Sequence, residues 1–129
     1  MVASVLVIFS MGILTYRGAT AKEALGTELL KLVPTWAEKQ GFTHNPTAIA
    51  GAKLFAQLGC LNCHTYQKNG SQSLKAPDLT HVGGSLSEAQ IIAVLHCPTC
   101  VKHGSQMPSY RSLPPNTIRQ IALFLSASH

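Results

Sequence analysis

The stretch "GCLNCHTYQKNG", residues 59–70, holds two cysteines separated by two residues, with a histidine directly after the second cysteine. Cys60, Cys63 and His64 thus spell C-x-x-C-H, the attachment sequence for a c-type haem. The spacing suits this chemistry because two thiols must reach two vinyl groups on one edge of the porphyrin. The next residue then lies under the ring, where an imidazole can bind iron. The stretch therefore predicts a covalent haem site.

Two other chemistries use a C-x-x-C pair. A thioredoxin-like redox site places it at the start of a helix after a strand and does not need the histidine. A zinc site needs a second pair of ligands, which Cys97 and Cys100 supply formally. The haem interpretation requires instead that the rest of the chain provide helices around the ring and a sixth iron ligand.

The sequence on both sides of the motif predicts helices and no convincing strand. Asn45 can cap a helix that has Pro46 in its first turn and runs up to the motif. A second helix begins at Ser87, which has the capping-box spacing to Gln90, and runs to about Leu95. A last helix starts near Asn116, with an inner face of Ile118, Ile121, Ala122 and Leu125. The expected fold class is all-α.

In order and spacing, residues 45–128 resemble a class I cytochrome c over essentially the whole domain. The resemblance implies a small all-α fold around one haem, in which the first and last helices cross. Gly51 and Phe55 would then meet Phe124 at that crossing. The stretches that carry the resemblance are "AGAKLFAQLGCLNCHT", "APDLTHVGG", "SEAQIIAVLHCP", "MPSY" and "IRQIALFLS".

The same resemblance implies the residues that hold the cofactor. One haem c would be bound covalently through Cys60 and Cys63, with His64 as the proximal iron ligand. The carbonyl of Pro77 would accept the Nδ1 proton of His64 and so fix the ring. Met107 would be the distal ligand, and a thioether there raises the reduction potential relative to a second histidine.

Other side chains compete with Met107 for the distal position. His103 lies four residues earlier in the same Gly/Ser-rich loop and is the strongest alternative. Met107 can also be simply a core residue. The remaining histidines that could bind are His44, His81, His96 and His129.

Cys97 and Cys100 depart from the family pattern. Val101 follows the pair where a haem motif would have histidine, which argues against a second covalent haem. Haem attachment takes place outside the cytoplasm, where disulfides persist. A Cys97–Cys100 disulfide is therefore expected. Free thiols and a pair that senses redox state remain alternatives.

The N-terminal part predicts a membrane anchor. Residues 2–16 contain no charged side chain, and a helix of 15 residues spans ~22 Å, so the anchor must extend to about residue 21 to approach the ~30 Å hydrocarbon core. The competing prediction is a signal peptide cleaved after "ATA" at 19–21, but no Lys or Arg precedes the apolar run. We assign residues 1–21 to an anchor helix, 22–44 to a helical segment and linker, and 45–129 to the haem domain.

Within the linker segment, the spacing of apolar residues from Leu25 to Val33 predicts a helix that Pro34 ends. Trp36 is expected either at the membrane interface or packed on the domain or on a partner subunit.

The net charge of +5 is small for a chain of 129 residues. Most of the excess lies after residue 44, which favours an acidic redox partner protein or an anionic membrane surface. The chain lacks a dense Lys/Arg cluster, which argues against nucleic acid. The basic residues there are Lys53, Lys68, Lys75, Lys102, Arg111 and Arg119, against Asp78 and Glu88.

A haem with two protein ligands has no open iron position, so the sequence predicts one-electron transfer without substrate chemistry. An anchored cytochrome c is typically a subunit of a respiratory or photosynthetic complex. "LTYRGATAKEALGTE" (14–28) loosely resembles the end of the last helix in b-type cytochrome subunits, which favours a quinol–cytochrome c oxidoreductase with b-type cytochrome and Rieske-type partners. An oxidase subunit, a reaction-centre donor and a soluble periplasmic carrier are alternatives. A haem enzyme or gas sensor is a further one. The expected location is the cell membrane, as a single-pass protein with its haem domain on the periplasmic side.

Overall fold

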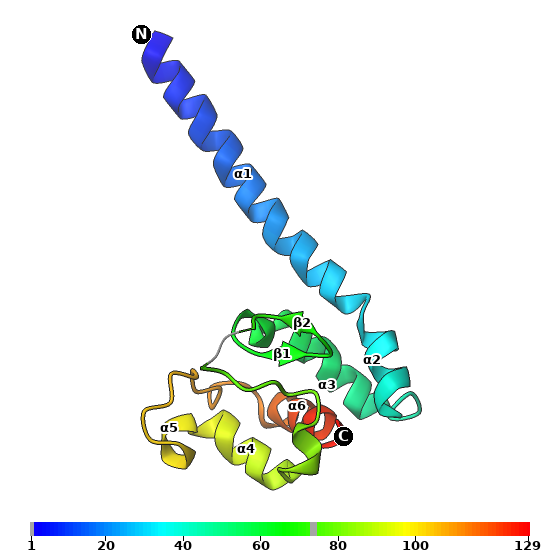
Figure 1. Ribbon diagram of the computed structural model, residues 1–129. Coiled ribbons are helices and arrows are strands. Elements are labelled where there is room, and N and C mark those ends of the chain that lie inside the picture. Colours follow the sequence, from blue (N-terminus) through cyan, green and yellow to red (C-terminus); the bar gives the residue numbers. More distant parts are fainter. Residues whose placement is uncertain (1, 73–74) are drawn as a thin grey trace.

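The computed structural model describes residues 2–72 and 75–129, with side chains at all of these positions except 2–6 and 19–26. A long helix extends from a small helical domain (Figure 1). The elements in chain order are α1 (Val2–Leu30), α2 (Val33–Gln40), α3 (Pro46–Gln57), the 3-10 turn η1 (Cys60–Asn62), β1 (Thr65–Tyr66), β2 (Asn69–Gly70), the 3-10 turn η2 (Val82–Gly84), α4 (Glu88–His96), α5 (Pro98–Val101) and α6 (Pro115–Ser126).

The expected anchor and the helical segment after it form one continuous helix, α1. This helix ends at Leu30, before Pro34, which stands instead in the first turn of α2. The prediction that Pro34 ends a helix was therefore wrong, because proline is tolerated at a helix start, where the N–H has no intrahelical partner. Among the described residues, no helix meets the length and hydropathy needed to cross a membrane. The side chains of the candidate cleavage stretch, 19–21, lie outside those described.

Helix α2 is part of the domain core. Trp36 is 1% exposed, and its ring packs against the rings of Phe55, Tyr66 and Phe124. Of the expectations for Trp36, packing on the domain is therefore confirmed. Phe42, in the segment expected to be a linker, is also buried against Phe124. The core thus includes residues between 33 and 42 as well as those after 45.

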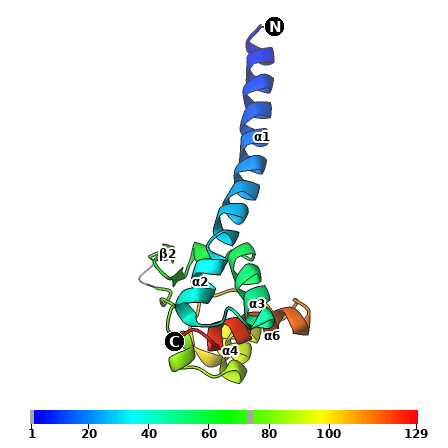
Figure 2. The same ribbon diagram turned by 90° about the vertical axis from the view of Figure 1, so that its right-hand side faces the viewer.

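A glutamine side chain ties α2 to two distant parts of the chain. The Gln40 amide nitrogen donates to the Thr80 carbonyl at 3.0 Å, and the amide oxygen accepts from the His129 backbone N–H at 2.8 Å. On the other side of α2, Leu29 and Leu32 pack against the core. Both ends of the short α2 are therefore held on the domain, which Figure 2 shows directly below α1.

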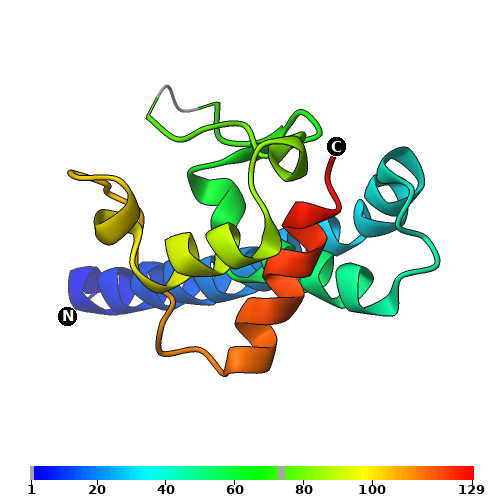
Figure 3. The same cartoon turned by 90° about the horizontal axis from the view of Figure 1, so that it is seen from below.

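Helices α3 and α6 cross at the centre of the domain (Figure 3). The aromatic rings of Phe55 in α3 and Phe124 in α6 meet there, with their centroids 5.4 Å apart. Gly51 permits the close approach, since a Cβ at this position would lie only 2.8 Å from the Phe124 Cβ and closer still to the Gln120 carbonyl oxygen. The helix crossing implied by the family resemblance is present. Asn45 caps α3 as expected, accepting a hydrogen bond from the Ala48 N–H at 3.0 Å.

A small hairpin interrupts the helical architecture. Strands β1 and β2 pair antiparallel, with Thr65 opposite Gly70, and the residues between the strands, Gln67 and Lys68, both have positive φ. Gly70 has a φ of +97°, and a Cβ there would lie 2.8 Å from the Leu61 side chain. Only glycine lets the hairpin fold back on the Cys60–Asn62 turn. The expectation of no strand was wrong at these four residues.

Candidate haem site

The C-x-x-C-H motif lies where α3 turns into η1. Helix α3 ends at Gln57, and Gly59 takes a left-handed conformation that starts the turn. Cys60 is buried and Cys63 exposed, and neither is part of a disulfide. The His64 N–H donates to the Cys60 carbonyl at 2.9 Å, which closes the turn and brings the histidine back over it.

His64, the expected proximal ligand, contacts the partner that the resemblance implies. The His64 Nδ1 lies 2.9 Å from the Pro77 carbonyl oxygen. Because a carbonyl oxygen can only accept, Nδ1 carries the proton and Nε2 keeps its lone pair for a metal. The hydrogen bond thus fixes both the orientation and the tautomer of the imidazole.

The loop that supplies the Pro77 carbonyl is clamped to the hairpin. Thr65 and Asp78 form a parallel β-bridge, and the Leu79 N–H donates to the Thr65 carbonyl at 2.9 Å. The Thr80 hydroxyl accepts from the Gln67 N–H at 2.8 Å and donates to the Asp78 carboxylate at 2.5 Å. These contacts hold Pro77 in place against the segment that directly follows His64.

The loop with Met107 is attached to the end of α4. The Ser109 hydroxyl donates to the His96 carbonyl at 2.6 Å, and the Tyr110 N–H donates to the Leu95 carbonyl at 2.8 Å. Met107 itself is half-buried and packs against the hydrophobic core. By contrast, its histidine competitors are all exposed: His44, His81, His96, His103 and His129.

Tyr110 connects this loop to the haem motif, a role that the sequence did not reveal although "MPSY" contains the residue. Burial raises the pKa of the Cys60 thiol to about 11, and a hydrogen bond with the Tyr110 side chain opposes part of the rise. Burial, together with Cys60 and Cys63 nearby, raises the pKa of Tyr110 to about 12. Both groups are therefore neutral at physiological pH in the chain to which haem has not yet been attached. The sequence signal for this contact was a tyrosine three residues after Met107. Its partner, Cys60, lies 50 positions earlier in the chain, so the signal could not identify the partner.

The described residues do not support the zinc site that was considered as an alternative to haem. In the described part of the chain, no group of three or more His, Cys, Asp or Glu side chains is placed to hold a metal ion. Cys97 and Cys100 are joined in a disulfide, so they cannot supply the second ligand pair that a zinc site would need.

A family comparison agrees with this geometry. The family described as cytochrome c oxidase, cbb3-type, subunit III matches residues 46–125. The chain belongs to this family. It is therefore a mono-haem c-type cytochrome, as its resemblance to class I cytochromes c implied, and it binds one haem c covalently. No curated protein and no solved structure matches the chain.

The donor set fits the haem that the family implies. Two cysteines outside any disulfide stand at the attachment spacing, and the hydrogen bond at the imidazole Nδ1 leaves Nε2 as the atom that would bind iron. When bound, the haem supplies an iron that cycles between ferric and ferrous states, and this cytochrome transfers electrons by that means. Cys60 and Cys63 would hold the porphyrin edge, and the Pro77 carbonyl would orient His64 toward the iron. Tyr110 lies within hydrogen-bonding distance of Cys60.

Proposed function

We propose that this cytochrome passes single electrons to an oxidase-type membrane complex, with Met107 as the distal iron ligand. The family match supports the oxidase, because the description of that family names a cbb3-type oxidase subunit. The sequence favoured a quinol–cytochrome c oxidoreductase, and that choice rested on a loose likeness in residues 14–28. The b-type and Rieske-type partners stay a prediction, as does an acidic partner protein for the basic domain.

The attachment of the Met107 loop supports its role as ligand. The hydrogen bonds from Ser109 and Tyr110 to the end of α4 fix the chain directly after Met107. The Tyr110 side chain reaches Cys60, so the loop returns to the haem motif itself. His103, by contrast, is exposed.

The ligand assignment is tested on ferric protein by absorption spectroscopy. We expect Met107→Ala to abolish the weak far-red band that reports Met–iron coordination and to lower the reduction potential. His103→Ala and the exposed control Gln106→Ala should change neither. A band that survives in Met107→Ala but disappears in another variant would reject Met107. A high-spin spectrum in the unaltered protein would favour the haem enzyme or gas sensor.

We further propose that α1 anchors the chain in the cell membrane, with the haem domain on the extracytoplasmic side. The large apolar side chains described on this helix are mostly exposed, so no described part of the chain covers them. Covalent haem attachment and a disulfide both favour the extracytoplasmic side. The exposed side chains are Val7, Ile8, Phe9, Met11, Ile13, Leu14 and Tyr16.

An alkaline wash of cell membranes tests the anchor. The full chain should stay in the pellet, and Met11→Lys/Leu14→Lys should be released. Val101→Lys, which adds one lysine at an exposed apolar position on the domain, should stay in the pellet. Release of the unaltered chain, or a mature chain without residues 1–21 by mass spectrometry, would favour the soluble carrier instead.

Affinity purification in mild detergent tests the complex. Co-purification of a copper- and haem-containing oxidase subunit is the expected result. Recovery of a Rieske iron–sulfur protein with a b-type cytochrome would show that the chain serves a quinol–cytochrome c oxidoreductase.

A further inference from the structure

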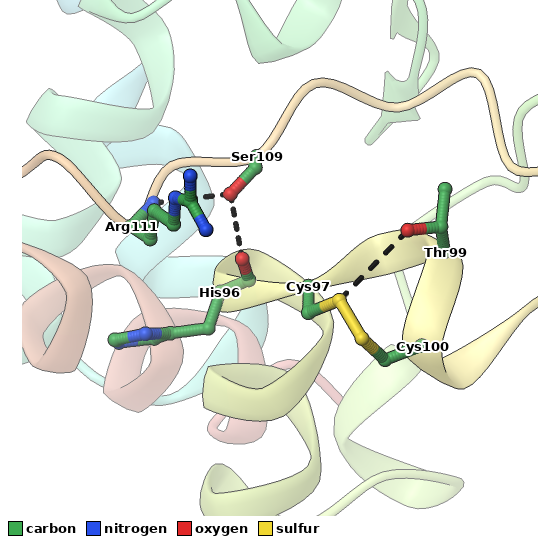
Figure 4. The surroundings of a disulfide bond; sticks show 6 residues. All are labelled: His96, Cys97, Thr99, Cys100, Ser109 and Arg111. Atoms are coloured by element: carbon green, nitrogen blue, oxygen red, sulfur yellow. Dashed lines mark hydrogen bonds between the residues drawn. A yellow bond between two sulfur atoms is a disulfide. The ribbon is translucent and has the colours of Figure 1, made fainter.

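The Cys97–Cys100 disulfide lies at the end of α4, directly before the Met107 loop. The Cα atoms of the two cysteines are 5.2 Å apart. The Cys97 N–H is the last to bond into α4, donating to the Ala93 carbonyl at 3.0 Å, while Cys100 belongs to α5. The bond therefore joins the C-terminus of α4 to the short helix from which the loop departs (Figure 4).

The loop returns to the same place. Ser109 bonds to the carbonyl of His96, the residue next to Cys97, and the Tyr110 N–H bonds to the carbonyl of Leu95. Figure 4 shows the Ser109 contact beside the disulfide. Residues 101–108 thus form a closed loop around Met107. Hydrogen bonds hold its returning end, and the disulfide holds its departing end covalently.

The departing end is weakly fixed apart from the disulfide. The backbone hydrogen bonds there join the Lys102 N–H to Pro98 and the Ser105 N–H to Lys102, all within a few residues of one another. Val101 is 56% exposed. Cys100 is exposed as well, while Cys97 is half-buried. A dissolved thiol can therefore reach the Cys100 side of the bond in the folded protein.

We propose that Cys97–Cys100 is a thiol-exchange site for dithiol reductants, and that its opening loosens the loop that carries Met107. The part of the proposal that concerns iron ligation rests on Met107 as the distal ligand. The part that concerns the loop itself does not.

Two thiol–disulfide exchange steps open the Cys97–Cys100 bond. A thiolate of the dithiol attacks the Cys100 sulfur, the S–S bond breaks, and Cys97 leaves as a thiolate that takes up a proton. The second thiol of the reductant, after losing its proton, attacks the mixed disulfide and releases Cys100, which is protonated in turn. Two electrons and two protons pass to the cysteines, and the reductant becomes a disulfide.

The loop-closure entropy sets the size of the effect. For a ring of four residues, the chain-entropy relation gives an increase of roughly 20-fold in the equilibrium for local opening of residues 97–100 when the bond is removed, which is the upper limit for the loop that follows. We expect the amide protons of Ser105 and Tyr110 to exchange up to about that much faster. Amides of α6, such as that of Ile121, should keep their rates and serve as the internal reference.

The test uses the full-length haem protein under native conditions. Dithiothreitol followed by iodoacetamide should add two carbamidomethyl groups, and exchange at Ser105 and Tyr110 should accelerate. Cys97→Ser/Cys100→Ser should show the fast exchange without treatment, and dithiothreitol should not change it further. Two modified cysteines with unaltered exchange would overturn the proposal, as would a bond that opens only when the protein unfolds.

A second readout separates this proposal from the proposed function. After alkylation, removal of reagents and reoxidation of the iron with ferricyanide, the Met–iron band should weaken and the potential should fall. Cys97→Ser/Cys100→Ser should show the same weaker band and lower potential without any treatment. A band that stays intact beside a loosened loop would overturn the link to the iron. If the untreated protein lacks the band, the assignment of Met107 fails, and the exchange data alone decide whether the disulfide fixes the loop.

Discussion

Gly51→Ala should destabilise the protein through the contact between α3 and α6. An added Cβ would lie 2.6 Å from the Gln120 carbonyl carbon and 2.8 Å from the Phe124 Cβ, where ordinary contact begins at 3.4 Å. Since one neighbour is backbone, α6 must move as a unit. Overpacking of this kind costs about 1–3 kcal/mol, and a rigid neighbour favours the upper end. The better helix propensity of alanine returns about 1 kcal/mol.

The expected net loss is about 2 kcal/mol, a large part of the ~5–15 kcal/mol that stabilises a typical domain. Urea unfolding of the haem protein, followed by far-UV circular dichroism, measures it. Gly84→Ala is the matched control, because a Cβ there meets nothing within 4 Å, and it should stay within about 0.5 kcal/mol of the parent. A Gly51→Ala protein as stable as the control would refute the argument that glycine is needed at the crossing.

Two further substitutions test individual hydrogen bonds. Tyr66→Phe removes the buried 2.7 Å contact with Ser128 and should cost about 1 kcal/mol at neutral pH. Burial raises the Tyr66 pKa to about 12, so its contribution is complete below pH 10 and fades as the pH rises toward 12. Stability measured across that window should fall less steeply in the variant, and an unchanged slope would contradict this. Ser87→Ala breaks the capping box with Gln90 and should lower the free energy of unfolding by about 1 kcal/mol, whereas Ser85→Ala should not; equal losses would argue against the cap.

The features that could be predicted from the sequence depend on short spacings. Asn45 and Ser87 cap α3 and α4 because a side chain and an N–H three residues later meet within one turn. The C-x-x-C-H motif is likewise a short spacing, so it can be recognised without knowledge of distant partners. Pro77 and Met107 were assigned only through the family resemblance, since nothing local to either residue identifies its role.

The features that were missed depend on distant partners or on strained local geometry. The burial of Trp36 requires Phe124 and Tyr66, which lie far along the chain, so its own neighbourhood is uninformative. The hairpin turn has Gln67 and Lys68 at positive φ, where Asn-Gly is the usual signal. The Thr80 contacts compensate for this local cost by binding the turn to the next loop.

The fixed position of α2 limits how the haem can meet its partners. Gln40 binds this helix to the Thr80 loop and to the C-terminus, and only Lys31 and Leu32 separate it from α1. A carrier on a flexible tether can shuttle between a donor and an acceptor. Here the end of α1 and the whole of α2 pack on the domain, and the structure shows no long tether between them. If α1 is held at a membrane, as proposed, the haem would stay at one height, and the protein would act as a stationary relay to which the other redox centres must come.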